Sequence, residues 1–132
     1  MIVVDASALM AILLNEAEAK ACAAVLERGS EAAISAASVA EALIVAGRRD
    51  CANEMATVIY ALGFEVVPVT EASARRVAAA HAQWGKGVHP AGLNFGDCFA
   101  YELARERDCP LLFVGADFSK IDVRSALTAP AR

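Results

Sequence analysis

Short runs of aliphatic residues alternate along this chain with longer segments in which apolar residues recur three or four positions apart. A short β-branched run is typical of a buried strand, and the three-to-four spacing is typical of a helix with one buried face. The pattern predicts strands at 2–4, 32–35, 65–69 and 111–115, with a short last strand at 121–123. It predicts helices at 7–14, 16–28, 38–49, 50–62, 71–84 and 95–107.

The order of these elements predicts the fold class. Strands that alternate with helices form a parallel sheet covered on both faces, so we expect an α/β fold, a three-layer α/β/α sandwich with a central, mainly parallel sheet. The length of 132 residues favours a single domain over 1–132. Because such sheets place their ligand sites at the carboxyl ends of the strands, functional side chains are expected just after the strands.

Local signals refine the ends of these elements. Ser35 or Ser38 is the expected N-cap of the third helix, since either hydroxyl can accept a hydrogen bond from a free backbone N–H group. Pro68 lacks an N–H group, which predicts an edge position for its strand or the end of that strand. Gly and Pro make 85–94 a loop, and 128–132 reads as a loose tail.

The composition predicts close-packed helices around a thin sheet. Hydrophobic residues make up 58% of the chain, above the roughly 45–50% of an average domain, and much of the excess is alanine. The four cysteines have no short paired spacing, so they indicate neither a zinc site nor a disulfide framework. The longest apolar run, 32–47, contains Glu41 and is too short to cross a membrane. The N-terminus lacks the basic leader of a signal peptide, so we expect a cytoplasmic protein without a membrane anchor.

The formal net charge is −4, from 12 Lys and Arg against 16 Asp and Glu. Nucleic-acid-binding proteins are usually basic, so this balance counts against nucleic-acid binding. The objection weakens if several of the acids bind a cation, because the cation cancels their charge in the working protein.

Four carboxylates stand alone in apolar stretches of the sequence. They are Asp5 in 1–15, Glu41 in 32–47, Asp97 in 87–101 and Asp117 in 109–119, and none of these stretches contains a Lys or Arg. Asp5 and Asp117 follow predicted strands, Asp97 lies in the first turn of a helix, and Glu41 lies within a helix. Any one of them has a structural explanation as a cap or a turn residue, except that Glu41 in mid-helix caps nothing.

An isolated ionised carboxylate in apolar surroundings costs several kcal/mol unless something compensates for it. Four such groups at one edge of a sheet either raise their pKa values and stay neutral or share a cation. Their expected convergence at this edge favours sharing, and hard oxygen ligands that leave room for water suit Mg²⁺ or Mn²⁺.

Four stretches of the chain resemble the successive acidic motifs of PIN-domain proteins. They are MIVVDASALMAILLNE, SAASVAEA, HPAGLNFGDCFAYELA and PLLFVGADFSKID. The nearest resemblance is to the VapC-type toxins of bacterial toxin–antitoxin pairs, and it extends over nearly the whole chain. It implies a small nuclease that cleaves RNA with Mg²⁺, for which Mn²⁺ can substitute.

The resemblance also implies roles and partners. Asp5, Glu41, Asp97 and Asp117 take the catalytic, metal-binding positions, and Ser7 takes the hydroxyl position of the first motif. Toxins of this kind usually form homodimers and are held inactive by a cognate antitoxin, through which alone they contact operator DNA. Relatives often carry Asn or Asp where this chain has Ala116, so the fourth acidic motif lacks one polar group.

Other residues are candidates because they lie near an acid in the sequence. Ser7, Ser38 and Asn94 could each orient a neighbouring carboxylate, and for Ser38 and Asn94 helix capping explains the residue equally well. Lys86, in the loop before Asp97, is a candidate contact for the substrate phosphates, with a solvated loop lysine as the alternative.

Two other functions remain open from the sequence. A PIN-like domain without catalytic activity would keep the fold and serve as a protein-binding module, which the missing polar group at Ala116 favours. A Mg²⁺-dependent phosphohydrolase of the haloacid-dehalogenase type would use Asp5 as nucleophile, but it needs a second acid where this chain has Ser7. A receiver-type domain is excluded, because Val3 and Val4 precede Asp5 where that class carries acids.

Overall fold

The computed structural model describes residues 1–29 and 31–128. Its strands are β1 (Ile2–Val4), β2 (Ala32–Ser35), β3 (Glu65–Val67) and β4 (Leu111–Leu112). Its helices are α1 (Ala6–Leu13), α2 (Ala19–Glu27), α3 (Ala36–Arg48), α4 (Ala52–Leu62), α5 (Glu71–Trp84) and α6 (Phe95–Arg107), with a 3₁₀ helix, η1, at Ala126–Thr128.

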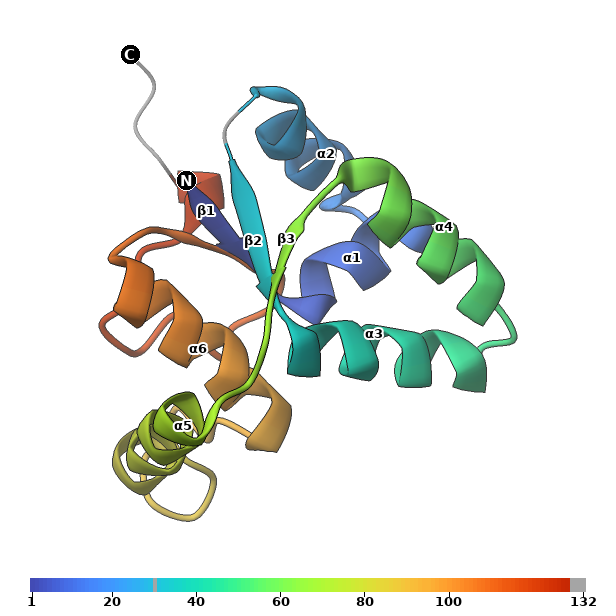
Figure 1. Cartoon of the computed structure of the whole chain (residues 1–132). Helices are drawn as coiled ribbons and strands as arrows, with labels where there is room; N and C mark the ends of the chain where they lie inside the picture. The colour runs from blue at the N-terminus through green and yellow to red at the C-terminus, as the bar shows by residue number, and fades with distance from the viewer. Residues whose placement is uncertain (30, 129–132) are drawn as a thin grey trace.

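The four strands form one parallel sheet in the order β3-β2-β1-β4. Helices α1 to α4 cover one face of this sheet, and α5 and α6 cover the other (Figure 1). The predicted three-layer α/β/α sandwich is therefore confirmed. The edge position predicted for the strand before Pro68 is also correct, since β3 is an outer strand and ends at Val67.

Two separate cores lie on the two faces of the sheet. Successive side chains of a strand point to opposite faces, so neighbouring residues of each strand enter different cores. Three of them pack with α5 and α6, namely Val3, Ala33 and Leu111. Their neighbours pack with α1 to α4, namely Val4, Ile34 and Leu112. All six are fully buried, which explains why the strands read as continuous apolar runs rather than alternating ones.

The end of β2 and the start of α3 meet without a connecting loop. Ser35, the last residue of β2, is also the N-cap of α3, and its Oγ accepts a hydrogen bond of 3.2 Å from the N–H group of Ala37. Of the two N-caps predicted, Ser35 is the correct one, and Ser38 lies buried one turn into the helix.

Two helices begin later than the sequence pattern predicts, because left-handed residues precede them. Asn15, with a φ of 54°, redirects the chain after α1, so that α2 begins at Ala19 rather than at 16. Asp50, with a φ of 63°, does the same before α4, which begins at Ala52. Asn and Asp adopt the left-handed conformation more readily than most residues. The spacing of hydrophobic residues contains no information about this conformation, so it does not predict these two turns.

The end of the chain departs most from the prediction. The strand predicted at 111–115 is only two residues long, and the one predicted at 121–123 is wrong. Turns and bends occupy 115–122, and a parallel bridge joins Leu111 to Ser125 instead. The Tyr101 hydroxyl donates a hydrogen bond of 2.7 Å to Asp122 Oδ1, which holds this segment against α6 rather than in the sheet.

Of the tail predicted at 128–132, Thr128 instead ends η1, and 129–132 lie outside the described residues. All four cysteines carry free thiols, and three of them are buried. Within the described part of the chain, no helix is long and apolar enough to cross a membrane.

Two glycines give a matched test of the helix ends. Gly63 caps α4 with a φ of 66°, whereas Gly47 lies inside α3 with only the Ala52 Cβ, at 4.0 Å, near the space a side chain would fill. Gly63→Ala should lower the free energy of unfolding by about 1 kcal/mol, because an alanine is strained at this positive φ whereas a glycine is not. Gly47→Ala should raise it by about 0.5–1 kcal/mol through helix propensity. Urea denaturation measures both, and equal signs would contradict this account.

Candidate active site

Four elements bring the predicted acids to the carboxyl edge of the sheet. Asp5 directly follows β1 and is the N-cap of α1, and Asp97 is the third residue of α6. Glu41 lies in the middle of α3, and Asp117 lies on the exposed turn that follows β4. Because β1 and β4 pair in parallel, the residues after both strands emerge at the same edge.

Asp5 is held by the start of its own helix. Its Oδ2 accepts a hydrogen bond of 3.0 Å from the N–H group of Ser7, and only 4% of the residue is exposed. The other carboxylate oxygen, Oδ1, is buried and has no hydrogen-bond partner among the described residues. A buried carboxylate oxygen without a partner is costly, so this atom is a candidate ligand for a cation.

Asp97 and Asn94 hold each other through a reciprocal pair of hydrogen bonds. Asn94 Oδ1 accepts from the Asp97 N–H group at 2.8 Å, and Asp97 Oδ2 accepts from the Asn94 N–H group at 3.0 Å. This capping box begins α6. The two explanations considered for Asn94 therefore describe one arrangement, since the cap also fixes the orientation of the Asp97 carboxylate.

Glu41 reaches across from α3 to the first turn of α6. Its carboxylate lies against Gly96, the residue before Asp97. Its Oε1 is buried and, like Asp5 Oδ1, has no hydrogen-bond partner in the described part of the chain. The sequence analysis predicts no role for Gly96, although a glycine in the first turn of a helix, next to an acid, is a local signal for one.

The pKa values show that the acids act on one another. Burial first, and then the charges of Asp5 and Asp97, raise the pKa of Glu41 to about 7. Burial raises the pKa of Asp97 to about 6, with the charges of Asp5 and Asp117 adding to it against the hydrogen bond from Asn94. The pKa of Asp5 is raised mainly by burial, against the hydrogen bonds from Ser7, and Asp117 adds a smaller repulsion.

These carboxylates fit a hard divalent cation. Within residues 1–29 and 31–128, no Lys or Arg forms an ion pair with any of the four acids, although peripheral acids such as Glu65 and Glu102 do have such partners. A bound cation would give Asp5 Oδ1 and Glu41 Oε1 a partner, and it would offset the repulsion between the carboxylates. In that same part of the chain, no three His, Cys, Asp or Glu side chains are grouped closely enough to hold a metal ion. A cation here would therefore bind one or two of the carboxylates and keep most of its waters, as hard divalent cations such as Mg²⁺ do.

The other predicted residues take different positions. Ser7 Oγ accepts a hydrogen bond of 3.0 Å from the Val114 N–H group, so it ties the first motif to the segment that leads to Asp117. Ser38 Oγ is buried without a hydrogen-bond partner among the described residues. Lys86 lies exposed on the 85–94 loop, where its backbone N–H group donates to the Leu93 carbonyl.

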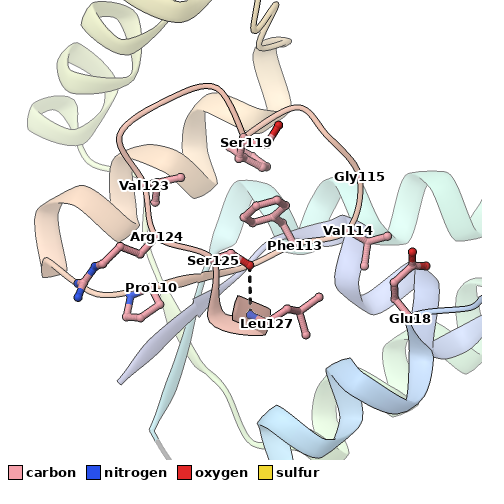
Figure 2. Close-up of a pocket in the computed structure, with 11 residues that line it drawn as sticks. Glu18, Pro110, Phe113, Val114, Gly115, Ser119, Val123, Arg124, Ser125 and Leu127 are labelled. Carbon is pink, nitrogen blue, oxygen red and sulfur yellow. Dashed lines mark hydrogen bonds between the residues drawn. The ribbon is translucent and has the colours of Figure 1, made fainter. Parts of the chain in front are cut away.

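A cavity of about 700 Å³ lies beside the segment that follows β4 (Figure 2). Phe113, Val123 and Leu127 line it, and residues of the 115–119 turn form part of its wall. None of the four predicted acids lines it; the one acidic lining residue is Glu18. Most of its other lining residues are apolar, and the predicted acids converge elsewhere, so the acidic edge remains the candidate site.

An α/β/α sandwich with acids at the carboxyl edge of a parallel sheet defines a class of protein, and comparison identifies that class. A family model described as the PIN domain matches residues 2–124. The chain therefore belongs to the PIN-domain family, as its motifs indicated.

Several relatives that match over most of the chain are named as VapC ribonucleases. Ribonuclease VapC28 of Mycobacterium tuberculosis is 43% identical over 129 residues, which cover 95% of this chain and 97% of the relative. Ribonuclease VapC30 of the same organism is 38% identical over 124 residues, covering 92% and 95%. The resemblance to VapC-type toxins is thus confirmed.

Two solved structures share the fold. One is Mycobacterium tuberculosis VapC20, described as a Sarcin-Ricin loop cleaving toxin, with a TM-score of 0.74, 16% identity and coverage of 91% of this chain and 94% of that one. The other is a toxin–antitoxin complex from Klebsiella pneumoniae, with a TM-score of 0.72, 16% identity and coverage of 96% and 98%. At this identity the likeness supports the fold alone.

The raised pKa of Glu41 predicts a pH-dependent stability in metal-free protein. Below pH 4.5 this carboxyl is protonated in both the folded and the unfolded chain, so the shift costs nothing. Above about pH 7 it is ionised in both, and the folded state bears the full cost of holding the charge. Glu41→Gln should therefore stabilise the chelator-treated protein at pH 8 by about 1–2 kcal/mol, less than the full linkage value because the side chain is partly exposed.

Urea denaturation at pH 8 and pH 5 in the presence of EDTA measures this difference. The gain in stability should shrink as the pH falls between these values. Glu16→Gln, at an exposed position, is the control and should change stability little at either pH. Destabilisation by Glu41→Gln at pH 8 without metal would show that the carboxylate has a compensating partner in the protein itself.

Proposed function

We propose that this chain is a metal-dependent endoribonuclease and the toxin of a VapBC-type toxin–antitoxin pair. The observation that carries the proposal is the convergence of Asp5, Glu41 and Asp97, which come from three distant segments and leave two buried oxygens unpartnered. Whole-length similarity to relatives named ribonucleases supports it independently.

Asp5 and Asp97 are the residues proposed to hold Mg²⁺ or Mn²⁺, since each has one oxygen fixed by a backbone N–H group. When bound, a divalent cation lowers the pKa of a coordinated water and stabilises charge that develops on a phosphodiester. Glu41 Oε1 faces the same edge from α3 and would accept a proton or a hydrogen bond from the attacking water. Attack at phosphorus with release of the 3′-oxygen leaves a 5′-phosphate and a 3′-hydroxyl.

The fourth acid has a subordinate role in this proposal. Asp117 is exposed, and it lies on a turn whose position depends on the bond between Val114 and Ser7. It repels Asp5 and Asp97, so it would add negative charge to the outer side of the ion. The methyl group of Ala116 offers no further polar group there, which is the feature that a catalytically inactive binding module would share.

The proposed partners follow from the family. A cognate VapB-type antitoxin would cover the acidic edge and keep the enzyme inactive, and operator DNA would be reached only through that antitoxin. A toxin–antitoxin complex among the structural neighbours agrees with such a partner. We further propose that the chain acts in the cytoplasm and forms a homodimer, as its family usually does.

Cleavage of RNA with Mg²⁺ present tests the proposed activity. Asp5→Asn and Asp97→Asn should each lower the cleavage rate by about 100-fold or more, since each replaces a charged ligand and removes several kcal/mol of transition-state stabilisation. Asp50→Asn is the matched control, because Asp50 is exposed and its φ of 63° also suits Asn. Wild-type rates in Asp97→Asn would contradict the proposal, and an inactive wild type that does not bind Mn²⁺ would favour the binding module.

Salt dependence tests the proposed phosphate contact of Lys86. In an inactive Asp97→Asn background, Lys86→Ala should weaken the binding of single-stranded RNA and reduce the slope of log K against log salt by about 0.7. Fluorescence anisotropy over a KCl series measures the slope. Lys20→Ala, on α2, is the control and should leave the slope unchanged. An unchanged slope in Lys86→Ala would leave that lysine as an ordinary solvated loop residue.

A further inference from the structure

Gly96 occupies a helical position where its own backbone does not require glycine. It is the second residue of α6, and its φ lies outside the left-handed range that favours glycine. Glycine in a helix is less favourable than alanine by up to about 1 kcal/mol. Another constraint must therefore explain why this position carries no side chain.

The space beside Gly96 is filled by the end of one side chain. A Cβ atom built on Gly96 would lie 2.5 Å from Glu41 Oε2, 2.7 Å from Glu41 Cδ and 2.8 Å from Glu41 Oε1. Real Cβ atoms essentially never approach another heavy atom closer than 3.0 Å. The three nearest atoms all belong to the Glu41 carboxylate, which sits at the end of a flexible chain. A side chain at 96 would therefore displace the carboxylate rather than the backbone.

The other crowded glycine behaves differently. A Cβ on Gly85 would meet the backbone carbonyl oxygen of His81 as well as its imidazole ring, so that contact is fixed by the backbone at the end of the helix. Within residues 1–29 and 31–128, which include all eight glycines, Gly96 is the only glycine beside which an acidic side chain fills the space. The contact thus joins the α3 acid to the α6 turn that carries Asp97.

The approach places the Glu41 carboxylate at the N-terminal turn of α6. Partial positive charge at a helix N-terminus favours a carboxylate there, within the first turn. Glu41 is close enough to Asp5 and Asp97 for their charges to raise its pKa. A methyl group on residue 96 would push the Glu41 carboxylate outward, because the two groups cannot approach closer than about 3.0 Å. The carboxylate would then lose its place against the first turn of α6.

We propose that Gly96 is a positioning residue, whose lack of a side chain lets the Glu41 carboxylate pack against the first turn of α6 beside Asp97. Any larger residue at 96 moves this carboxylate away from the acidic edge. The inference rests on the proposed function for its effect on catalysis, but the contact itself can be tested without metal or substrate.

Gly96→Ala tests the effect on the site. Affinity for Mn²⁺, measured by calorimetry on the full chain, should fall by about 10-fold, as is usual when an orienting neighbour of a metal ligand is lost, and RNA cleavage should fall with it. Gly47→Ala is the matched control, a glycine in a helix with open space around it, and should change neither. In a Glu41→Ala background, Gly96→Ala should cause no further loss of Mn²⁺ affinity. An equal loss in both backgrounds would show that Gly96 does not act through Glu41 and would overturn the proposal.

Thermal unfolding with EDTA tests the contact independently of function. In the Glu41→Ala background, Gly96→Ala should raise Tm by a few degrees, because only helix propensity acts. With Glu41 present, the clash should reduce or reverse this rise. Equal shifts in both backgrounds would mean that the two residues do not touch, whether or not the protein binds metal. If the wild-type protein neither binds Mn²⁺ nor cleaves RNA, the proposed function is refuted, but the contact between Gly96 and Glu41 is still supported by the difference in Tm.

Discussion

The placement of β1 between β2 and β4 is the constraint on which the rest of the structure depends. Its three residues are buried on both faces of the sheet, and the Asp5 N–H group donates to the Leu112 carbonyl at 2.9 Å. Parallel pairing on both sides forces the following residues to one edge. Ser35, which ends β2, starts α3 at this edge and thereby sets where Glu41 lies along the helix. Asp5 is thus positioned by the sheet itself rather than by a flexible loop.

The same constraint makes the site unfavourable in the metal-free chain. Asp5 and Asp97 are 4% and 7% exposed, and Glu41 joins them from α3, so that carboxylates that repel one another share a poorly solvated edge. A stable protein would more often place neutral or paired groups there. Backbone N–H groups compensate Asp5 and Asp97 only in part, because each secures just one of two oxygens. The acidic edge therefore lowers the free energy of unfolding of the metal-free protein, and a bound cation would raise it again.

The sequence was sufficient for the fold class because the elements carry consistent signals. Short aliphatic runs and helical periodicity predicted all four observed strands and all six helices. Solitary acids in apolar stretches predicted that Asp5, Glu41 and Asp97 lie close together. The errors fall where three-dimensional contacts override local pattern. The segment at 121–123 is β-branched at both ends, but the bond from Tyr101 to Asp122 draws it away from the sheet. A role for Gly96 was not predicted because the local pattern shows only a glycine beside an acid, and its contact is with Glu41, 55 positions earlier.

The pairing of β1 with β4 determines when the acidic edge can be completed during synthesis and folding. Asp5 precedes all six helices in the sequence, yet its backbone N–H group is bonded to Leu112 and the nearby Ser7 side chain to Val114, both of which follow α6. Contacts between such distant segments form late in folding, since the entropy of closing a long loop must be overcome first. A growing polypeptide that has not yet reached β4 contains α1 to α6 but lacks the completed edge. A nuclease built in this way has no complete active site until β4 has been synthesised and paired with β1.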